Sequence, residues 1–443
     1  MSTFRRSDVI ALGFMTFALF LGAGNLIIPP DVGRQAGTDF WPATLGFLAT
    51  GVGLPLLGVV AAAMCGGGLR EITRPLPVWA AIAFGMAIYL SIGPLFAIPR
   101  TATVAFEMGT SPWLANGSES KIALAIYTLV FFVASAYLAL SPGKLMDRIG
   151  RYITPALILV LIVMAAGILL DPQGSAGSRS ETVAQGAFAF GFMQGYQTMD
   201  ALASVVFGIV IIQAIRERGI KDRASIARYT LMAGVIAALC LSLVYVPLAW
   251  LGATSHSVAS QYDNGGQLIA VYITEIFGPA GQLILALVIT LACLTTAVGL
   301  LTSCGEYFNQ LMPKISYRVF VVVLAIFSAL VANQGLSQII QLSIPVLVAL
   351  YPLTMTLIGL SLARPWMRDP QRVFAWAMGV TAIIALYDGL AVAKLTPVGL
   401  ETWYQQLPMA SSGMAWLTPA LVAVAIGWAL QKRGSENIAS MGS

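Results

Sequence analysis

The sequence contains little charge, and this scarcity excludes a soluble protein. Of the 443 residues only 10% are charged and 58% are hydrophobic, and the mean hydropathy is +0.84. Soluble globular chains carry roughly 25% charged residues, because their surfaces face water. The 43 glycines and 22 prolines are scattered among apolar residues, so the composition is neither that of a disordered chain nor that of collagen.

Histidine and cysteine are also scarce. Enzymes embedded in membranes usually carry clustered His, Asp or Cys, whereas this chain has a single histidine, His256. We therefore expect no enzyme and no catalytic residues. The basic residues do not cluster with aromatic ones, so we expect no nucleic-acid partner despite the net charge of +5. The four cysteines lie in or beside apolar runs and predict buried thiols without disulfides: Cys65, Cys240, Cys293 and Cys304.

What the chain does contain is a series of long apolar runs. A helix needs about 20 residues to cross a hydrocarbon core roughly 30 Å thick. The runs therefore predict an all-α polytopic membrane protein, surrounded by a lipid bilayer, with twelve transmembrane helices. The first run lacks a cleavage site, which favours a retained span. The predicted spans are 8–30, 40–65, 77–99, 121–140, 152–170, 184–214, 229–252, 279–303, 317–333, 338–362, 373–393 and 411–430.

The distribution of basic residues predicts the orientation. Cytoplasmic loops of membrane proteins are enriched in Lys and Arg. If both termini are cytoplasmic, most of the 24 basic residues lie on the inside of the plasma (inner) membrane. The predicted outside segments then hold only Arg34, Arg100, Lys121, Arg179 and Lys394.

No predicted connection is long enough for a soluble domain, the longest being about 253–278. A receptor built on such a bundle would normally carry a signalling domain. A channel would show rings of pore-lining charge or a repeated filter sequence. The sequence shows neither feature, which favours a transporter.

Two predicted spans contain glycine-rich interruptions, at residues 22–25 (Gly-Ala-Gly-Asn) and 191–197 (Gly-Phe-Met-Gln-Gly-Tyr-Gln). An unpaired backbone group in hydrocarbon costs several kcal/mol, so a break at mid-depth indicates a cavity or neighbouring protein. Broken helices use their half-helix N-termini to hold anions and their unwound carbonyls to hold cations. The alternative is that the glycines only let helices pack closely.

The positions of the interruptions favour a binding site. They fall in the first and sixth of the twelve predicted spans, as expected for two five-helix units of opposite topology. The single transporter domain, 1–443, would then comprise a first repeat at 8–170, an inverted repeat at 184–362 and two additional helices at 373–430.

Three segments resemble signature segments of a known family. Residues 22–30, 93–103 and 191–200 look like those of the BrnQ-type branched-chain amino acid:cation symporters. That family belongs to the amino acid–polyamine–organocation superfamily with the LeuT-like fold. The resemblance implies import of leucine, isoleucine and valine by alternating access, coupled to sodium as the only cofactor.

The resemblance also implies a sodium site between the first and eighth spans. Small hard cations prefer oxygen ligands. The ligands would be the carbonyls of Ala18, Leu21 and Ala292 and the hydroxyls of Thr295 and Thr296. The alternative is that each threonine only bonds a carbonyl of its own helix.

For the substrate, the resemblance implies that backbone ends hold the zwitterion. Helix ends supply partial charges of about half a unit, so charged side chains are not required. The α-carboxylate would meet the N–H groups of Ala23 and Gly24. The α-ammonium and the aliphatic side chain would meet residues of the sixth and third spans: Phe190, Gly191, Phe192, Met193, Tyr196 and Ile92.

Polar residues inside spans are further candidates, because an acidic group at mid-bilayer costs roughly 2.5–3.5 kcal/mol. Asn25 resembles a ligand of a second cation. Asp200 could orient Gln197, contact the cation or accept a proton, which leaves a proton-coupled importer as the alternative function. The lack of a histidine within the spans, or of a lysine in the fifth, favours sodium. For Asp388, in the eleventh span, we expect a structural pairing or a position near the interface.

Arg100 and Glu107 lie at the predicted outer end of the third span. Their spacing of seven residues places them on one helix face, where they could form an ion pair or an outer gate. The alternative is that each extends toward the interface.

Overall fold

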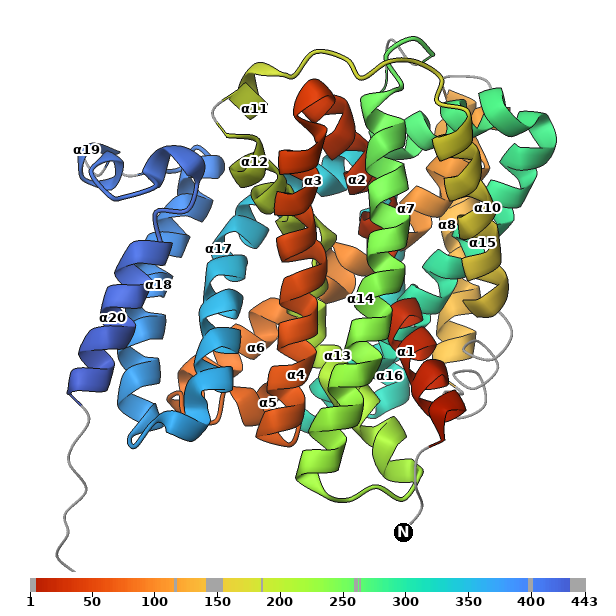
Figure 1. Ribbon diagram of the computed structural model, residues 1–443. Coiled ribbons are helices and arrows are strands. Elements are labelled where there is room, and N and C mark those ends of the chain that lie inside the picture. Colours follow the sequence, from red (N-terminus) through yellow and green to blue (C-terminus); the bar gives the residue numbers. More distant parts are fainter. Residues whose placement is uncertain are drawn as a thin grey trace, which may run out of the picture.

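In the computed structural model, the structure describes residues 5–114, 118–140, 154–184, 186–258, 262, 264–396 and 401–430, and every regular element in these ranges is a helix (Figure 1). The first half contains α1 (Arg6–Phe20), α2 (Ala23–Ala36), α3 (Phe40–Leu48), η2 (Ala49–Gly53), α4 (Leu54–Cys65), α5 (Leu69–Ile72), α6 (Val78–Leu90), η3 (Ser91–Leu95), α7 (Ala97–Gly109), α8 (Ser118–Ala139) and α10 (Thr154–Leu170).

The second half begins with the short helices α11 (Glu181–Ala184), α12 (Ala187–Gln194) and η6 (Gly195–Thr198). The longer helices follow: α13 (Asp200–Glu217), α14 (Arg223–Ala253), α15 (Gly265–Leu311), α16 (Tyr317–Ala332), α17 (Leu336–Ala363), α18 (Pro370–Val392) and α20 (Leu417–Ala429). The short α19 (Glu401–Gln405) lies between α18 and α20.

The lengths and compositions of these helices fit a membrane protein. Among the described residues, seven helical stretches are long and apolar enough to cross a bilayer, and an eighth results if the α12–η6 and α13 segments form one span bent by 47°. Shorter apolar helices lie at Leu157–Leu170, Tyr317–Ala332 and Leu417–Ala429. Large apolar side chains point outward from the bundle, as lipid contact requires; Leu129, Leu243 and Leu330 are each more than half exposed.

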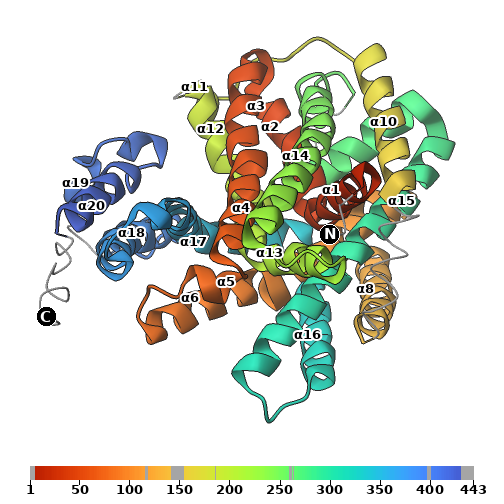
Figure 2. The ribbon, with the colours of Figure 1, turned by 60° about the horizontal axis from the view of Figure 1, so that its bottom comes forward.

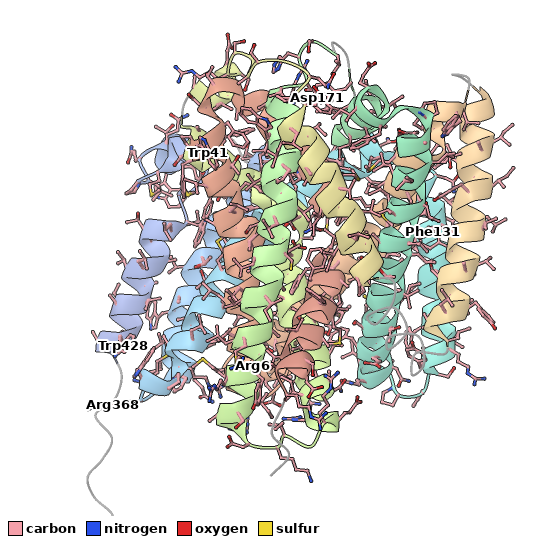
Figure 3. All side chains as sticks on the ribbon, turned by 45° about the vertical axis from the view of Figure 1, so that its right-hand side comes forward. Arg6, Trp41, Phe131, Asp171, Arg368 and Trp428 are labelled. Atoms are coloured by element: carbon pink, nitrogen blue, oxygen red, sulfur yellow. The ribbon has the colours of Figure 1, made fainter. Side chains whose placement is uncertain are left out.

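Two of the arginines that are predicted to lie inside share one end of the bundle. Figure 3 shows Arg6 and Arg368 at one end and Asp171 at the other. The chain enters α1 and leaves α20 at the same end (Figure 1). Residues 141–153 and 431–443, where further basic residues are predicted to lie inside, are outside the described residues.

The C-terminal helices lie at the periphery. Figure 2 shows α18 and α20 to one side of the bundle, with α17 between them and the elements around α1, α4 and α13. α18 packs on α17, and α20 packs on α18. This placement separates α18 and α20 from the broken helices at the centre.

One predicted boundary is wrong. The third span does not end at residue 99, because α7 continues to Gly109. The predicted connection 253–278 is partly helical, because α15 begins at Gly265 and kinks at Gly278, which has a φ of 64° and precedes Pro279. His256 does lie between α14 and α15.

Close backbone contacts at glycines position the broken helices. A Cβ at Gly191 of α12 would lie 1.8 Å from the Ala43 carbonyl oxygen of α3. A Cβ at Gly33 of α2 would lie 1.7 Å from the Ala249 carbonyl oxygen of α14. Any side chain at either position would push the two helices apart. For Gly191 the structure therefore fits the alternative interpretation, in which the glycine lets helices pack closely.

Candidate functional site

The first span is broken between α1 and α2, where the sequence predicts it. The Leu21 N–H donates to the Phe17 carbonyl at 2.8 Å and ends α1. The Gly22 N–H donates to Asn25 Oδ1 at 3.1 Å, so the Asn25 side chain caps the start of α2. Residues 21–25 are all buried, and the break therefore lies in the protein interior.

The sixth span is broken at Met199, beyond the predicted 191–197. Residues 187–194 are helical, η6 follows, and Met199 adopts a left-handed conformation with a φ of 65° before α13 begins at Asp200. The Asp200 N–H donates to Thr198 Oγ1 at 3.3 Å. The break thus places a buried carboxylate at the N-terminus of α13.

A buried polar cluster joins the two breaks. The Asn25 side-chain amide donates hydrogen bonds to Asp200 and to the Tyr245 hydroxyl. Tyr245, from α14, in turn donates to Asp200 Oδ2 at 3.2 Å. Buried polar groups are stable when each finds a partner, so this cluster fixes α2, α13 and α14 relative to one another.

A cavity of about 40 Å³ lies beside this cluster, between the broken spans. Two of its walls are the first break and the start of α13. The others come from the third span and from α15. The residues that matter for the argument are Gly22, Ala23, Gly24, Asn25, Ile92, Arg100, Asp200 and Thr296.

The structure brings together one part of the predicted substrate site. Ala23, Gly24 and Ile92 line the cavity, as do Asn25 and Asp200. Five predicted residues of α12 and η6 are absent from its walls: Phe190, Gly191, Phe192, Met193 and Tyr196.

Those residues instead pack toward α3, η2 and α17. The Phe192 carbonyl accepts a hydrogen bond from Thr50 Oγ1 at 2.8 Å. The Tyr196 ring stacks on Tyr351 with the ring centroids 4.4 Å apart. Phe190 is half-buried at the first turns of α12, and a Cβ at Gly413 would lie 3.2 Å from the Met193 methyl group.

Of the predicted sodium ligands, three meet at the first break. Thr296 Oγ1 donates to the Leu21 carbonyl at 3.3 Å and to the Ala292 carbonyl at 3.1 Å. Thr295 Oγ1 donates only within its own helix, to the Ala292 carbonyl at 2.8 Å. Ala18 lies in the last turn of α1, before Leu21.

The distribution of basic residues predicts Arg100 at the outer end of its span. This prediction is wrong, because Arg100 lies in the protein interior and is only 2% exposed. The third span is also broken: η3 contains Gly93 in a non-helical conformation, followed by Pro94. α7 therefore starts anew at Ala97 and carries Arg100 in its first turn. The Gly-Pro pair within an apolar run is the sequence signal for this break.

Arg100 and Glu107 do not pair with each other. Arg100 Nη1 donates to the Gln197 carbonyl at 2.6 Å, and Nη2 donates to Ser343 Oγ at 3.0 Å. Glu107 accepts a hydrogen bond from Gln267 at 3.4 Å. Both the ion pair and the extension of Arg100 to the interface are wrong, because the arginine binds the sixth-span break.

Asp388 lies in α18, away from the cavity, and is buried. Tyr404 of α19 lies near its carboxylate, whose buried Oδ2 atom has no hydrogen-bond partner among the described residues. The structural pairing of Asp388 stays a prediction.

Solved structures with the same arrangement of helices define the class of fold. The transporter Mhp1 of the nucleobase-cation-symport-1 family, solved in a closed conformation with bromovinylhydantoin bound, matches with a TM-score of 0.61 over 95% of this chain and 91% of that chain, at 14% identity. MhsT in complex with L-phenylalanine matches with a TM-score of 0.56 over 94% and 98%, at 16% identity. The chain therefore has the LeuT-like fold.

Sequence comparisons identify the family. The family model for branched-chain amino acid transport proteins matches residues 5–433. The chain is 51% identical to the branched-chain amino acid transport system 2 carrier protein of Pseudomonas aeruginosa over 95% of both chains. It is 43% identical to the branched-chain amino acid permease BrnQ of Escherichia coli over 98% of both. The chain belongs to the family of branched-chain amino acid transport proteins, which are carriers and not enzymes.

Proposed function

We propose that this protein imports leucine, isoleucine and valine, coupled to sodium, by alternating access. The observation that carries the proposal is the cavity at the first break, where the N-terminus of α2 and the Leu21 carbonyl lie beside Thr296. Once the walls of the cavity separate, a zwitterion and a cation could be bound there side by side. The printed names of the relatives in Pseudomonas aeruginosa and Escherichia coli support the substrate class.

The cation site that we propose consists of uncharged oxygens. The Leu21 and Ala292 carbonyls both lie within hydrogen-bond distance of Thr296 Oγ1. Rotation of the hydroxyl proton away from these carbonyls would leave three oxygen atoms facing one small space, which suits a hard cation. Ala18 and Thr295 complete the proposed set. Sodium entry across 100 mV releases about 2.3 kcal/mol, before any concentration gradient is counted.

The size of the cavity supports an alternating-access cycle. Binding sites for small molecules enclose about 300–1,000 Å³, whereas this cavity measures about 40 Å³. Leucine can enter only if the walls separate. We infer that α12 moves relative to α2, which would bring Phe190, Gly191, Phe192, Met193 and Tyr196 toward the substrate side chain.

For the topology we propose twelve spans, with inverted five-helix repeats at 8–170 and 184–362 and two further helices at 373–430. The separation of Arg6 and Arg368 from Asp171 supports cytoplasmic termini in the plasma membrane (Figure 3). The peripheral position of α18 and α20 supports their assignment as additions to the ten-helix core (Figure 2).

A proton-coupled importer is the second candidate, because Asp200 lines the cavity and contacts Asn25. Uptake of labelled leucine into proteoliposomes separates the two functions. An inward sodium gradient should drive accumulation, and an inward proton gradient at the same membrane potential should not. Accumulation that follows the proton gradient and ignores sodium contradicts sodium coupling.

Competition tests the substrate class in the same assay. Unlabelled leucine, isoleucine and valine should each inhibit uptake more strongly than glycine, proline or lysine. Equal inhibition by all six amino acids contradicts the assignment.

A further inference from the structure

Arg100 is a buried cation at the meeting point of the three broken spans. Its side chain extends from the first turn of α7, and its Nη1 donates to the Gln197 carbonyl beside the sixth-span break. A Cβ placed on Gly24, in the first turn of α2, would lie 3.2 Å from the same Nη1 atom. The guanidinium therefore lies against the N-terminus of α2, where the backbone N–H groups of Ala23 and Gly24 begin the helix.

The partners of Arg100 do not neutralise its charge. They are a backbone carbonyl at 2.6 Å and the Ser343 hydroxyl at 3.0 Å. Arg100 Nε has no hydrogen-bond partner, although the atom is buried. Among the ion pairs of the described residues, none involves Arg100. A buried guanidinium without a carboxylate is costly, and guanidinium groups bind carboxylates through two parallel hydrogen bonds.

Arg100 also lines the cavity beside the α2 N-terminus. Two sources of positive potential thus face one small space, the guanidinium and the positive end of the helix dipole. Asp200, whose carboxyl oxygen accepts hydrogen bonds from Asn25 and Tyr245, lines another wall of the same cavity. A zwitterionic ligand would match both.

We propose that Arg100 binds the α-carboxylate of the transported amino acid, together with the N–H groups of Ala23 and Gly24. This assignment rests on the proposed function and adds a charged receptor to the backbone donors. It also gives a reason for glycine at position 24, because a side chain there would press on the guanidinium and on the Gln197 carbonyl, 3.3 Å from the added Cβ. The carboxylate is then the part of the substrate that links α2, α7 and the sixth-span break.

The test compares leucine with leucinamide, which keeps the side chain and the ammonium but lacks the carboxylate. Binding to the purified full-length protein is measured for wild type, Arg100→Gln and Arg100→Lys. Because a hydrogen bond to a charged group is lost, leucine affinity should fall at least about tenfold in Arg100→Gln, whereas leucinamide affinity should change little. Arg100→Lys should fall between the other two, because it keeps the charge but not the two-pronged geometry.

Ser343→Ala is the matched control. It removes one partner of Arg100 while leaving the guanidinium in place, so the preference for leucine over leucinamide should remain. Thermal unfolding of each variant verifies that the variant is folded. If Arg100→Gln does not fold, the comparison of leucine with leucinamide is made with Arg100→Lys. A purely structural arginine would lower binding of both ligands by the same factor.

The proposal is overturned if a folded Arg100 variant keeps the wild-type preference for leucine, or loses both ligands equally. Failure of the proposed function has a different signature, since wild type itself would then transport no branched-chain amino acid.

Discussion

The side-chain amide of Asn25 donates a hydrogen bond to the carboxylate of Asp200, and this contact joins the breaks of the first and sixth spans in the protein interior. Tyr245 of α14 donates to the same carboxylate oxygen at 3.2 Å. Any motion that separates the two breaks must therefore exchange or break these hydrogen bonds. The cluster is well placed to couple the backbone at the first break to the geometry of α13.

Replacing Asn25 tests this role. Asn25→Ala removes the cap of the Gly22 N–H and a donor to Asp200, and buried groups left without partners cost about 1–3 kcal/mol each. We expect lower thermal stability and loss of leucine uptake. Asn333→Ala is the control, because Asn333 donates to Ala329 and Thr128 away from the cavity and should leave uptake near wild type. Normal uptake by Asn25→Ala contradicts the coupling role.

The two threonines of α15 should differ in their effect on sodium. Thr296 contacts the Leu21 carbonyl across the break, whereas Thr295 bonds only its own helix. A lost ligand to a cation costs at least as much as a charged hydrogen bond, so Thr296→Ala should raise the sodium concentration for half-maximal uptake about tenfold or more. Thr295→Ala should raise it less. Thr296→Ser keeps the hydroxyl and serves as the control.

Equal effects of Thr295→Ala and Thr296→Ala would contradict the geometry at the break. No effect of either would remove the proposed site altogether. The measurement is the sodium dependence of the initial rate of leucine uptake at constant ionic strength.

Gly191 should be needed for packing. A Cβ at this position would lie 1.8 Å from the Ala43 carbonyl oxygen, and neither backbone can yield without separating α12 from α3. Overpacking typically costs about 1–3 kcal/mol, so Gly191→Ala should lower the unfolding temperature measurably. Gly359→Ala is the matched control, because an added Cβ there meets nothing within 4 Å. Equal unfolding temperatures for the two variants contradict this interpretation.

Asp388 should matter for stability and not for transport. It lies near Tyr404 in helices at the periphery of the bundle (Figure 2), and neither residue lines the cavity. Asp388→Asn should keep the apparent affinities for leucine and sodium while lowering thermal stability. Asp200→Asn, measured beside it, should reduce uptake strongly. Loss of sodium dependence in Asp388→Asn would show that the eleventh predicted span takes part in coupling.

The sequence predicts the break in the first span more accurately than the break in the sixth span, because the two breaks depend on contacts of different range. The first break depends on residues close together in the sequence, because Asn25 accepts a hydrogen bond from the Gly22 N–H and caps the start of α2. The sixth break falls at Met199, whose left-handed backbone no local preference predicts; the contacts of Asp200 with Asn25 and Tyr245 are long-range. The glycine at 191, which attracted the prediction, serves the contact with α3.

Arg100 shows a second reason for the incomplete prediction. An arginine at the end of an apolar run is typical of a membrane interface, and charge counting therefore places it outside. The third span is in fact broken at Gly93 and Pro94, and its second helix, α7, continues past Arg100 to Gly109. A Gly-Pro pair inside an apolar run indicates a helix break in the same way as a glycine cluster does.

Linkage between leucine and sodium at the first break is the central claim, and binding to the purified protein tests it most directly. Allosteric coupling typically changes affinity about 5–150-fold, and the change must be reciprocal. Leucine should bind at least about fivefold more tightly in saturating sodium than in choline, and sodium more tightly by the same factor when leucine is present. Equal leucine affinity in sodium and in choline would contradict the account.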